Sequence, residues 1–268
     1  INRDEKTVTV KHVQTGETYD ESYDVLILSP GAKPIVPAIP GLKENNSLFT
    51  LRNIPDTDAI KNYADNHLPQ KAVIVGGGFI GVEMAENLAN RGIEVTLVEM
   101  ANQIMAPIDM EMAAILHMHL REKGVQLILE NGVQSFAEEG KKIILSDGTE
   151  LQTDMTILSI GVMPENELAK SAGLALGQRG GIIVNDYLQT SNDHIYAVGD
   201  AVEVADYITG TKTMIPLAGP ANRQGRIAAN NLMGKKEKYQ GTVGTSIAKV
   251  FDLTVASTGN NEKTLKRL

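Results

Sequence analysis

The stretch that decides the fold runs from Ala72 to Met100 and reads AVIVGGGFIGVEMAENLANRGIEVTLVEM. An apolar run leads into three consecutive glycines, and a helix-compatible run and a second apolar run follow. The pattern predicts a strand, a glycine turn, a helix and a second strand. Within it, Gly76-x-Gly78-x-x-Gly81 matches the fingerprint of dinucleotide-binding domains.

Each glycine of the fingerprint has a physical role. Gly76 permits the tight turn, Gly78 lets the backbone approach a pyrophosphate, and Gly81 lets helix and strand pack closely. The phosphates would face the free N–H groups and the positive dipole end of the helix. A purely structural glycine turn is the alternative, but the preceding strand, the following helix and a downstream acid argue against it.

That acid is Glu99, which ends the second strand 18 residues after Gly81. A carboxylate at this position can accept two hydrogen bonds from an adenosine ribose, and it would repel a 2′-phosphate. The next basic residue is Arg121. The sequence therefore predicts NADH as the nucleotide, with NADPH possible, while a surface acid at a strand end is the other interpretation of Glu99.

Composition excludes several classes of function. The chain has 268 residues, of which 42% are hydrophobic and 22% charged, as in ordinary globular proteins. No apolar run approaches the ~18 residues needed to span a bilayer. The net charge is −8 and the 25 Lys and Arg are scattered, which argues against nucleic-acid binding. Without cysteine, the chain alone can form neither disulfides nor a thiol nucleophile. We expect a cytoplasmic protein with no membrane or nucleic-acid partner.

An internal repeat explains why the fingerprint begins about seventy residues into the chain. The segments DVLILSPGAKP, from Asp24, and DMTILSIGVMP, from Asp154, share the pattern D-x-x-I-L-S-x-G-x-x-P at an offset of 130 residues. Both follow a β-rich hairpin sequence with a turn signal, Thr15-Gly16 in one and Asp147-Gly148 in the other. We interpret the early residues as the tail of a first dinucleotide domain that is truncated here. A β-rich extension with coincidental similarity is the alternative.

The remaining pattern predicts the other elements. We expect a hairpin and strand over 6–29, an irregular proline-rich connector, helices over 56–66 and 109–123, a hairpin to about 148, a buried strand over 155–160, a helix from Pro220 to Gly234, and a single strand over 242–256. The methionines between 100 and 118 are interpreted as core residues. His117 and His119 point to different helix faces, so no metal site is expected.

Two further motifs suggest a second nucleotide. Gly199-Asp200 follows an apolar strand, where a carboxylate could hold polyol hydroxyls and backbone N–H groups could face phosphate. A cap on a turn would look the same. Small residues at Ala218 and Gly219, with Pro220 beginning a helix, would let a flat ring such as a flavin approach the backbone. Ordinary helix packing is the alternative there.

In combination, the motifs YDVLILSPGAKP, GGGFIGVEMAENL, ILSIGVMPEN, IYAVGDAVEV, IPLAGPANRQGRIAANN and GTSIAKVFDLTVASTG resemble the flavin-dependent pyridine nucleotide–disulfide oxidoreductases, with the last two most similar to the coenzyme A-disulfide reductase and NADH oxidase/peroxidase branch. Some members of that branch carry a rhodanese domain. The resemblance implies an α/β fold: two Rossmann-like, three-layer ββα domains, the first truncated, and the start of a C-terminal α+β interface domain. It places the FAD-binding domain in 1–53 and 178–240, the NAD(P)H-binding domain in 54–177, and the dimerisation domain in 241–268.

The resemblance also implies residue roles. Phe79 would be an aromatic gate over the flavin, Glu83 would contact the carboxamide or lie near flavin N5, and Asp200 would bind the ribityl chain of FAD. The remaining residues implied in cofactor binding are Gly76, Gly78, Ile80, Gly81, Glu99 and Gly161 for NADH, and Ser29, Gly31, Gly199, Ala218, Gly219 and Pro220 for FAD. The catalytic residues would be Glu83 and Phe79, with the redox cysteine of the family outside this sequence.

The implied activity is hydride transfer from NADH to FAD and on to a disulfide, such as coenzyme A disulfide, or to a persulfide. An NADH oxidase or peroxidase of the same fold is the first alternative. A non-catalytic NADH-binding fragment is the second, because an N-terminal FAD fingerprint is not in this sequence. The parent enzyme is expected to be a homodimer.

Overall fold

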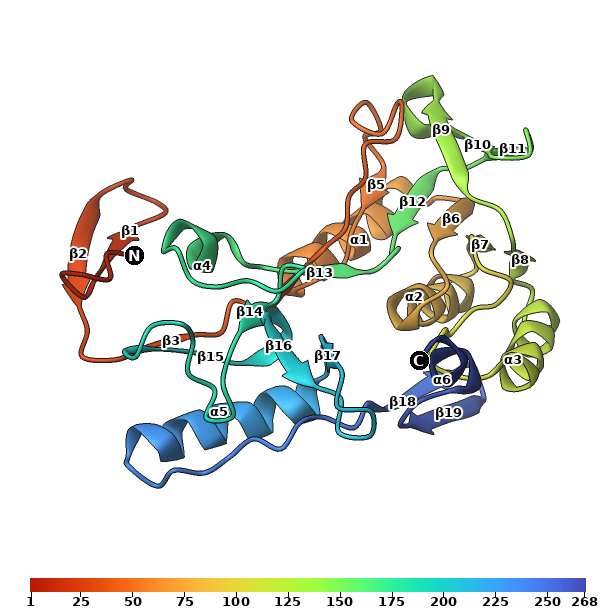
Figure 1. Ribbon diagram of the computed structural model, residues 1–268. Coiled ribbons are helices and arrows are strands. Elements are labelled where there is room, and N and C mark those ends of the chain that lie inside the picture. The colour runs from red at the N-terminus through yellow and green to blue at the C-terminus, as the bar shows by residue number, and fades with distance from the viewer. The chain divides into compact units, whose positions relative to one another are not determined.

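The computed structural model describes residues 1–268 and divides into two compact units (Figure 1). Unit 1 comprises Ile1–Lys33 and Met163–Gly244, and unit 2 comprises Pro34–Val162 and Thr245–Leu268. The chain therefore passes between the units three times. None of the helices has the length and apolar character that crossing a membrane requires.

Unit 2 is built on a parallel sheet of five strands in the order β5-β12-β6-β7-β8. These strands are β5 (Leu48–Phe49), β6 (Lys71–Val75), β7 (Glu94–Val98), β8 (Gln126–Ile128) and β12 (Met155–Leu158). The helices are α1 (Ile54–His67), α2 (Phe79–Asn90) and α3 (Met110–Glu122). An antiparallel sheet holds β9 (Val133–Ala137), β10 (Lys142–Leu145) and β11 (Glu150–Gln152), with the 3-10 turn η1 (Glu138–Gly140) between the first two.

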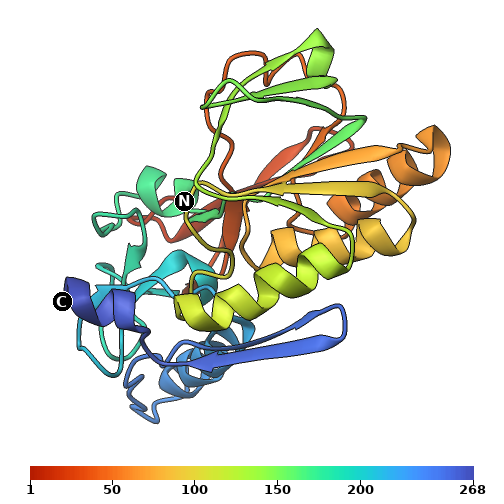
Figure 2. The ribbon, with the colours of Figure 1, turned by 90° about the vertical axis from the view of Figure 1, so that its right-hand side faces the viewer.

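The central sheet of unit 2 is covered on both faces. Side chains alternate along each strand, so neighbouring residues contribute to different cores. Ile74, Leu97 and Ile157 are fully buried in a core shared with the helices. Their neighbours Val75 and Leu158 belong to a second core, shared with β9 and β10. Figure 2 shows the green antiparallel strands on one side of the sheet and the orange to yellow-green helices on the other. The predicted three-layer ββα architecture is confirmed.

Unit 1 is a smaller α/β assembly with short strands. Strand β3 (Leu26–Leu28) pairs in parallel with β15 (Ile195–Ala197), and β14 (Ile182–Ile183) pairs in parallel with β16 (Val202–Ala205). The remaining elements are the hairpin β1 (Thr7–Lys11) and β2 (Thr18–Ser22), β17 (Lys212–Thr213), α4 (Glu167–Ser171), the 3-10 turn η2 (Gly199–Ala201) and α5 (Ala218–Leu232). The buried residues of these strands and helices form one core.

The two copies of the sequence repeat fold alike. Each gives a strand, β3 or β12, followed by a left-handed glycine and a second short strand, β4 (Ala32–Pro34) or β13 (Val162–Pro164). In unit 1 the Glu165 N–H donates to the Gly31 carbonyl, and in unit 2 the Ile35 N–H donates to the Gly161 carbonyl. The repeat therefore corresponds to a common structural motif. Strand β4 includes Pro34, so the proline-rich connector is not wholly irregular, because a terminal strand residue need not donate a ladder hydrogen bond.

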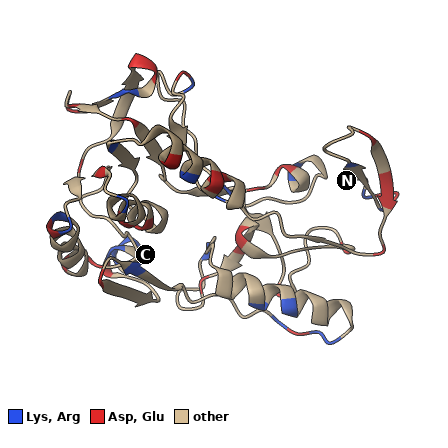
Figure 3. Cartoon of the chain, turned by 180° about the vertical axis from the view of Figure 1, so that it is seen from behind, with Lys and Arg blue, Asp and Glu red and all other residues tan.

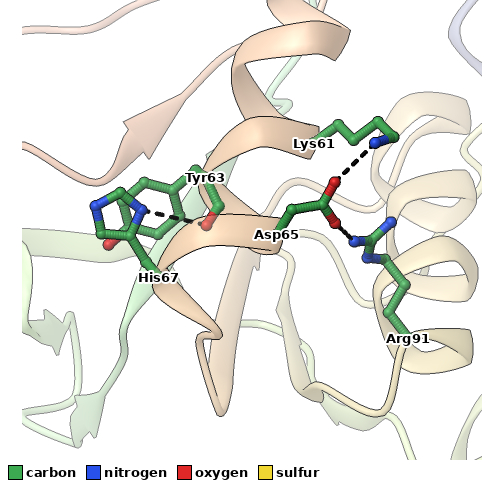
Figure 4. Close-up of polar contacts among 5 residues, drawn as sticks. All are labelled: Lys61, Tyr63, Asp65, His67 and Arg91. Atoms are coloured by element: carbon green, nitrogen blue, oxygen red, sulfur yellow. Dashed lines mark hydrogen bonds and ion pairs between the residues drawn. The ribbon is translucent and has the colours of Figure 1, made fainter.

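Polar contacts fix helix α1 within unit 2 (Figure 4). The Asp65 carboxylate accepts hydrogen bonds from Lys61, at 2.7 Å, and from Arg91, just past the end of α2. The hydrogen bond from Lys61 is the main cause that lowers the pKa of Asp65. Tyr63 stacks on His67, and its hydroxyl donates to the Asp154 carbonyl beside β12. Helix α1 is thus tied to both α2 and the sheet.

The C-terminal residues pack on unit 2, and they correct one prediction. The expected single strand over 242–256 is a hairpin of β18 (Thr245–Val250) and β19 (Leu253–Thr258), followed by α6 (Glu262–Arg267). Phe251 makes the turn with a left-handed φ of 53°, and its N–H donates to Glu86 of α2. The pattern concealed this turn because it contains no glycine or proline.

Other expectations need smaller corrections. Helix α5 begins at Ala218, two residues before Pro220, because the first helical N–H groups need no partner. Of the methionines interpreted as core, Met105 is buried, but Met100, Met112 and Met118 are more than half exposed. The compact units divide the chain at 33/34, 162/163 and 244/245. The predicted domain boundaries at 53/54, 177/178 and 240/241 stay predictions. Which nucleotide each unit binds stays a prediction. Figure 3 shows Lys and Arg distributed over both units, with Asp and Glu among them.

Candidate dinucleotide site

The candidate site lies at one edge of the unit 2 sheet. Strands β6, β7 and β12 are parallel, so their carboxyl ends bring Gly76, Glu99 and Gly161 to the same edge. A cavity of about 540 Å³ opens there. It is lined by residues from the glycine turn, from the loop after β7, from the segment after β8, and from the end of β12. This is the place where open α/β sheets bind their ligands.

At two positions of the turn, close backbone contacts leave no room for any residue larger than glycine. Gly76 has a φ of 107°, and a Cβ atom there would lie 2.4 Å from the Ser159 carbonyl oxygen. Gly81 is buried in α2, and its Cβ would lie 1.9 Å from the Gly76 carbonyl oxygen. Neither neighbour is a flexible side chain, so the backbone itself would have to move. The predicted roles of tight turn and close packing agree with this geometry.

Gly78 differs, because nothing in the protein requires a glycine there. A Cβ at Gly78 would meet no atom within 4 Å, and the residue is exposed. It is the N-cap of α2, with no side-chain cap and no acidic residue in the first turn. Open space in front of free N–H groups at a helix N-terminus fits a phosphate group.

The carboxylate of Glu99 is held in place by two backbone donors. Its Oε2 accepts from the Gly77 N–H at 2.7 Å, and its Oε1 accepts from the Ala101 N–H at 2.8 Å. The side chain is half-buried and lines the cavity. A carboxylate can accept about four hydrogen bonds, so lone pairs remain for ribose hydroxyls. Glu99 is therefore part of a built site rather than a solvated surface acid.

Two residues that sequence reasoning did not select also shape the turn. The Ser159 hydroxyl lies 3.1 Å from the Val75 carbonyl oxygen and 3.0 Å from that of Gly76, so it donates to the end of β6. Gly77 packs against the Ile104 side chain, which a Cβ at Gly77 would approach to 2.6 Å. The repeat, in which Ser159 matches Ser29, could have indicated the role of Ser159. No pattern in the sequence indicates the contact between Ile104 and Gly77.

The residues predicted to act near the nicotinamide lie on the first turns of α2. Phe79 and Ile80 are half-buried, and Phe79 packs against the helical core of unit 2. Glu83 is exposed one turn later, and its side chain has no hydrogen bond or ion pair within the protein. Their positions follow the glycine turn directly. The gating and carboxamide roles stay predictions.

Unit 1 brings the predicted flavin residues together at its own strand ends. Because β3 and β15 are parallel, Ser29 and Gly31 follow one strand end while Gly199 and Asp200 follow the other. The Asp200 side chain is half-buried without a hydrogen bond or ion pair in the protein. Burial raises the pKa of this carboxyl above its usual value. An unpaired, partly desolvated carboxylate is a suitable acceptor for ligand hydroxyls.

Helix α5 begins beside the same strand ends. The Gly199 N–H donates to the buried Gln224 side chain at 2.7 Å, which joins η2 to α5. Like Gly78, Gly219 has open space where a Cβ would be. Ala218 and Gly219 are exposed and Pro220 is half-buried, and the helix start has no side-chain cap. The predicted FAD residues therefore cluster within unit 1, as the predicted NADH residues do within unit 2.

Comparison with known proteins decides the family. The profile described as pyridine nucleotide-disulphide oxidoreductase matches residues 1–225. The chain belongs to the pyridine nucleotide–disulphide oxidoreductase family. That match includes all the predicted site residues of both units, so the resemblance of the motifs is confirmed.

Three members of the family illustrate the similarity. An NADH oxidase of Methanocaldococcus jannaschii is 38% identical over 97% of this chain and 58% of its own length. A coenzyme A disulfide reductase of Staphylococcus haemolyticus is 34% identical over 97% of this chain and 58% of its own length. The crystal structure of reduced Bacillus anthracis CoADR-RHD is 63% identical, with a TM-score of 0.98, over 100% of this chain and 48% of that one. The chain thus spans somewhat more than half the length of its curated relatives.

Proposed function

We propose that unit 2 contains the NADH-binding domain, and unit 1 the remainder of the FAD-binding domain, of a flavin-dependent disulfide or persulfide reductase. The observation that carries the proposal is the glycine turn. Its forced glycines, Gly76 and Gly81, build the turn, and the unforced Gly78 leaves room at a helix N-terminus beside Glu99. The residues present fit a dinucleotide.

Within this proposal each part of the chain has a distinct task. The N–H groups at the start of α2 bind the pyrophosphate of NADH, and Glu99 binds the adenosine ribose. Asp200 would bind the ribityl hydroxyls of FAD, and the start of α5 would accommodate its isoalloxazine ring. When bound, the nicotinamide supplies a hydride, and the flavin passes electrons on to coenzyme A disulfide, another small disulfide or a persulfide.

A second candidate is an NADH oxidase or peroxidase. It is favoured by the 38% identity to relatives named NADH oxidase from Methanocaldococcus jannaschii and Enterococcus faecalis. In the family that the motifs resemble, both activities depend on a redox cysteine, and this chain contains no cysteine. The proposed activity therefore belongs to a longer parent, which we expect to be a cytoplasmic homodimer. The 268-residue chain by itself is proposed to bind NADH without turnover.

Nucleotide preference tests the proposal. We expect the chain to bind NADH more tightly than NADPH, and Glu99→Arg to reverse the order by replacing repulsion of the 2′-phosphate with attraction. Glu94 lies at the opposite end of β7 and is exposed. Glu94→Arg is therefore the matched control, with the same charge change and no expected reversal. Isothermal titration of both nucleotides into the three proteins measures this, and an unaltered order in Glu99→Arg would show that Glu99 is not the ribose ligand.

A further inference from the structure

The loop between β7 and α3 holds the glycine turn from behind. The Met105 N–H donates to the Gly77 carbonyl at 2.8 Å, while Glu99 accepts from the Gly77 N–H. The Ile104 side chain fills the space beside Gly77. Both backbone groups of Gly77 are therefore satisfied by this loop. Any shift of the loop would be transmitted to the turn in front of it.

The loop has an unusual backbone that needs support. Met105 has a left-handed φ of 51° although it is not a glycine, a strained conformation that side-chain-bearing residues rarely adopt. Its neighbour Ile104 is bound by side chains on both of its backbone groups. The Ile104 N–H donates to His117 Nε2 at 3.2 Å, and the Ile104 carbonyl accepts from Gln103 Nε2 at 3.3 Å. Gln103 also donates to the Ile108 carbonyl at 3.0 Å.

Of the two side chains bound to Ile104, only His117 comes from outside the loop. Elsewhere the loop is also held by Asn261, whose Nδ2 donates to the Ala106 carbonyl. His117 lies on the buried face of α3, is 5% exposed and does not line the nucleotide cavity. Burial, and secondarily the charge of Arg121, lower the pKa of His117, so its Nε2 is an unprotonated acceptor at neutral pH. The other histidine of α3, His119, instead makes an edge contact with Phe251 of the C-terminal hairpin.

We propose that His117 is a positioning residue for the nucleotide site: it fastens Ile104, and through Ile104 and Met105 it holds Gly77 in the conformation that binds the pyrophosphate. The inference rests on the proposed function, because it assigns unit 2 a dinucleotide. It does not make His117 a catalytic residue, since the side chain acts only through the loop.

The test uses three variants of the 268-residue chain. His117→Leu removes the acceptor, whereas His117→Gln keeps an oxygen that can accept from Ile104. His119→Leu makes the same chemical change two residues away on the same helix and serves as the matched control. We expect the Kd for NADH, measured by isothermal titration at a temperature where every variant is folded, to rise roughly tenfold in His117→Leu. It should stay within about twofold of wild type in the other two.

Hydrogen–deuterium exchange of residues 103–108 and of Gly77 provides a readout that does not depend on NADH. Faster exchange in His117→Leu, with protection retained in His117→Gln, would support the anchoring. An unchanged Kd in His117→Leu would overturn the proposal, even if the melting temperature fell, because the role would then be purely structural. If wild type itself did not bind NADH, the proposed function would fail, and the exchange data would still decide whether His117 fixes the loop.

Discussion

Strands β12 and β3 come from the two copies of one sequence repeat, yet they lie in different surroundings. In unit 2, β12 has a paired strand on each side, β5 and β6, and Ile157 at its centre is fully buried. In unit 1, β3 pairs only with β15, and its equivalent Ile27 is 41% exposed. The motif sets the strand and the glycine turn, whereas burial depends on the neighbours that pair with it. The additional neighbour of β12 that has no counterpart beside β3 is β6, the strand that leads into the glycine fingerprint.

Two fingerprint glycines of unit 2 and the glycines of α5 in unit 1 also differ in their surroundings. In unit 2, the protein's own backbone excludes a side chain at Gly76 and Gly81. In unit 1, Gly219 and Gly225 of α5 have open space around the position of a Cβ atom. Forced glycines indicate a finished turn. No contact within unit 1 requires a glycine at either of these positions of α5.

The largest contrast is expected for the paired core residues. Ile157→Ala should destabilise the chain by about 2–5 kcal/mol, because it leaves a cavity in a fully buried site. Ile27→Ala should cost less than about 1 kcal/mol, since the side chain is already partly solvated. Urea unfolding midpoints measure both. Equal losses of unfolding free energy in the two variants would show that Ile157 and Ile27 do not differ in burial.

The next contrast concerns Gly81 and Gly225. Gly81→Ala places a methyl group against the Gly76 carbonyl oxygen, so the turn must shift. We expect the strain, of about 3 kcal/mol, to lower the affinity for NADH roughly 100-fold. Gly225→Ala should leave NADH affinity unchanged and raise stability by about 0.5–1 kcal/mol, as expected inside a helix. Titration calorimetry and thermal unfolding separate the outcomes. Tight NADH binding by Gly81→Ala would mean that the turn is not shaped as described.

The smallest contrast is that of the repeated serines. Ser159 donates to the end of β6, so Ser159→Ala should cost about 1 kcal/mol of stability and weaken NADH binding severalfold. Ser29 is exposed and makes no hydrogen bond through its side chain in unit 1. Ser29→Ala should therefore be neutral in the isolated chain. A comparable loss in both variants would mean that Ser29 already has a partner that the structure does not show.

Sequence reasoning reached the fold and part of the site because those features are local. The spacing of Gly76, Gly78 and Gly81 fixes the turn, and the period of the flanking runs fixes β6, α2 and β7. The position of Glu99 at a strand end follows from the same pattern. Each of these depends on residues close together in the chain.

The remaining features could not be predicted because they depend on tertiary contacts. Nothing in the sequence shows that Ile104 packs on Gly77 or that His117 accepts from the Ile104 N–H, since the loop must first fold back. The turn at Phe251 escaped notice because it lacks glycine and proline, and apolar alternation continues on both sides of it. Likewise, Met112 and Met118 continue the apolar pattern of α3 but lie on its exposed face.

The most direct test of the account is the nucleotide content of the purified 268-residue chain. An absorbance spectrum after gel filtration reports bound FAD, and isothermal titration reports NADH. We predict one NADH site per chain and no stoichiometric flavin. In unit 2 the glycine turn follows β6, which pairs with β12, whereas in unit 1 no strand that pairs with β3 leads into a glycine fingerprint. A chain that retains one tightly bound FAD through gel filtration, or that fails to bind NADH, would contradict this prediction.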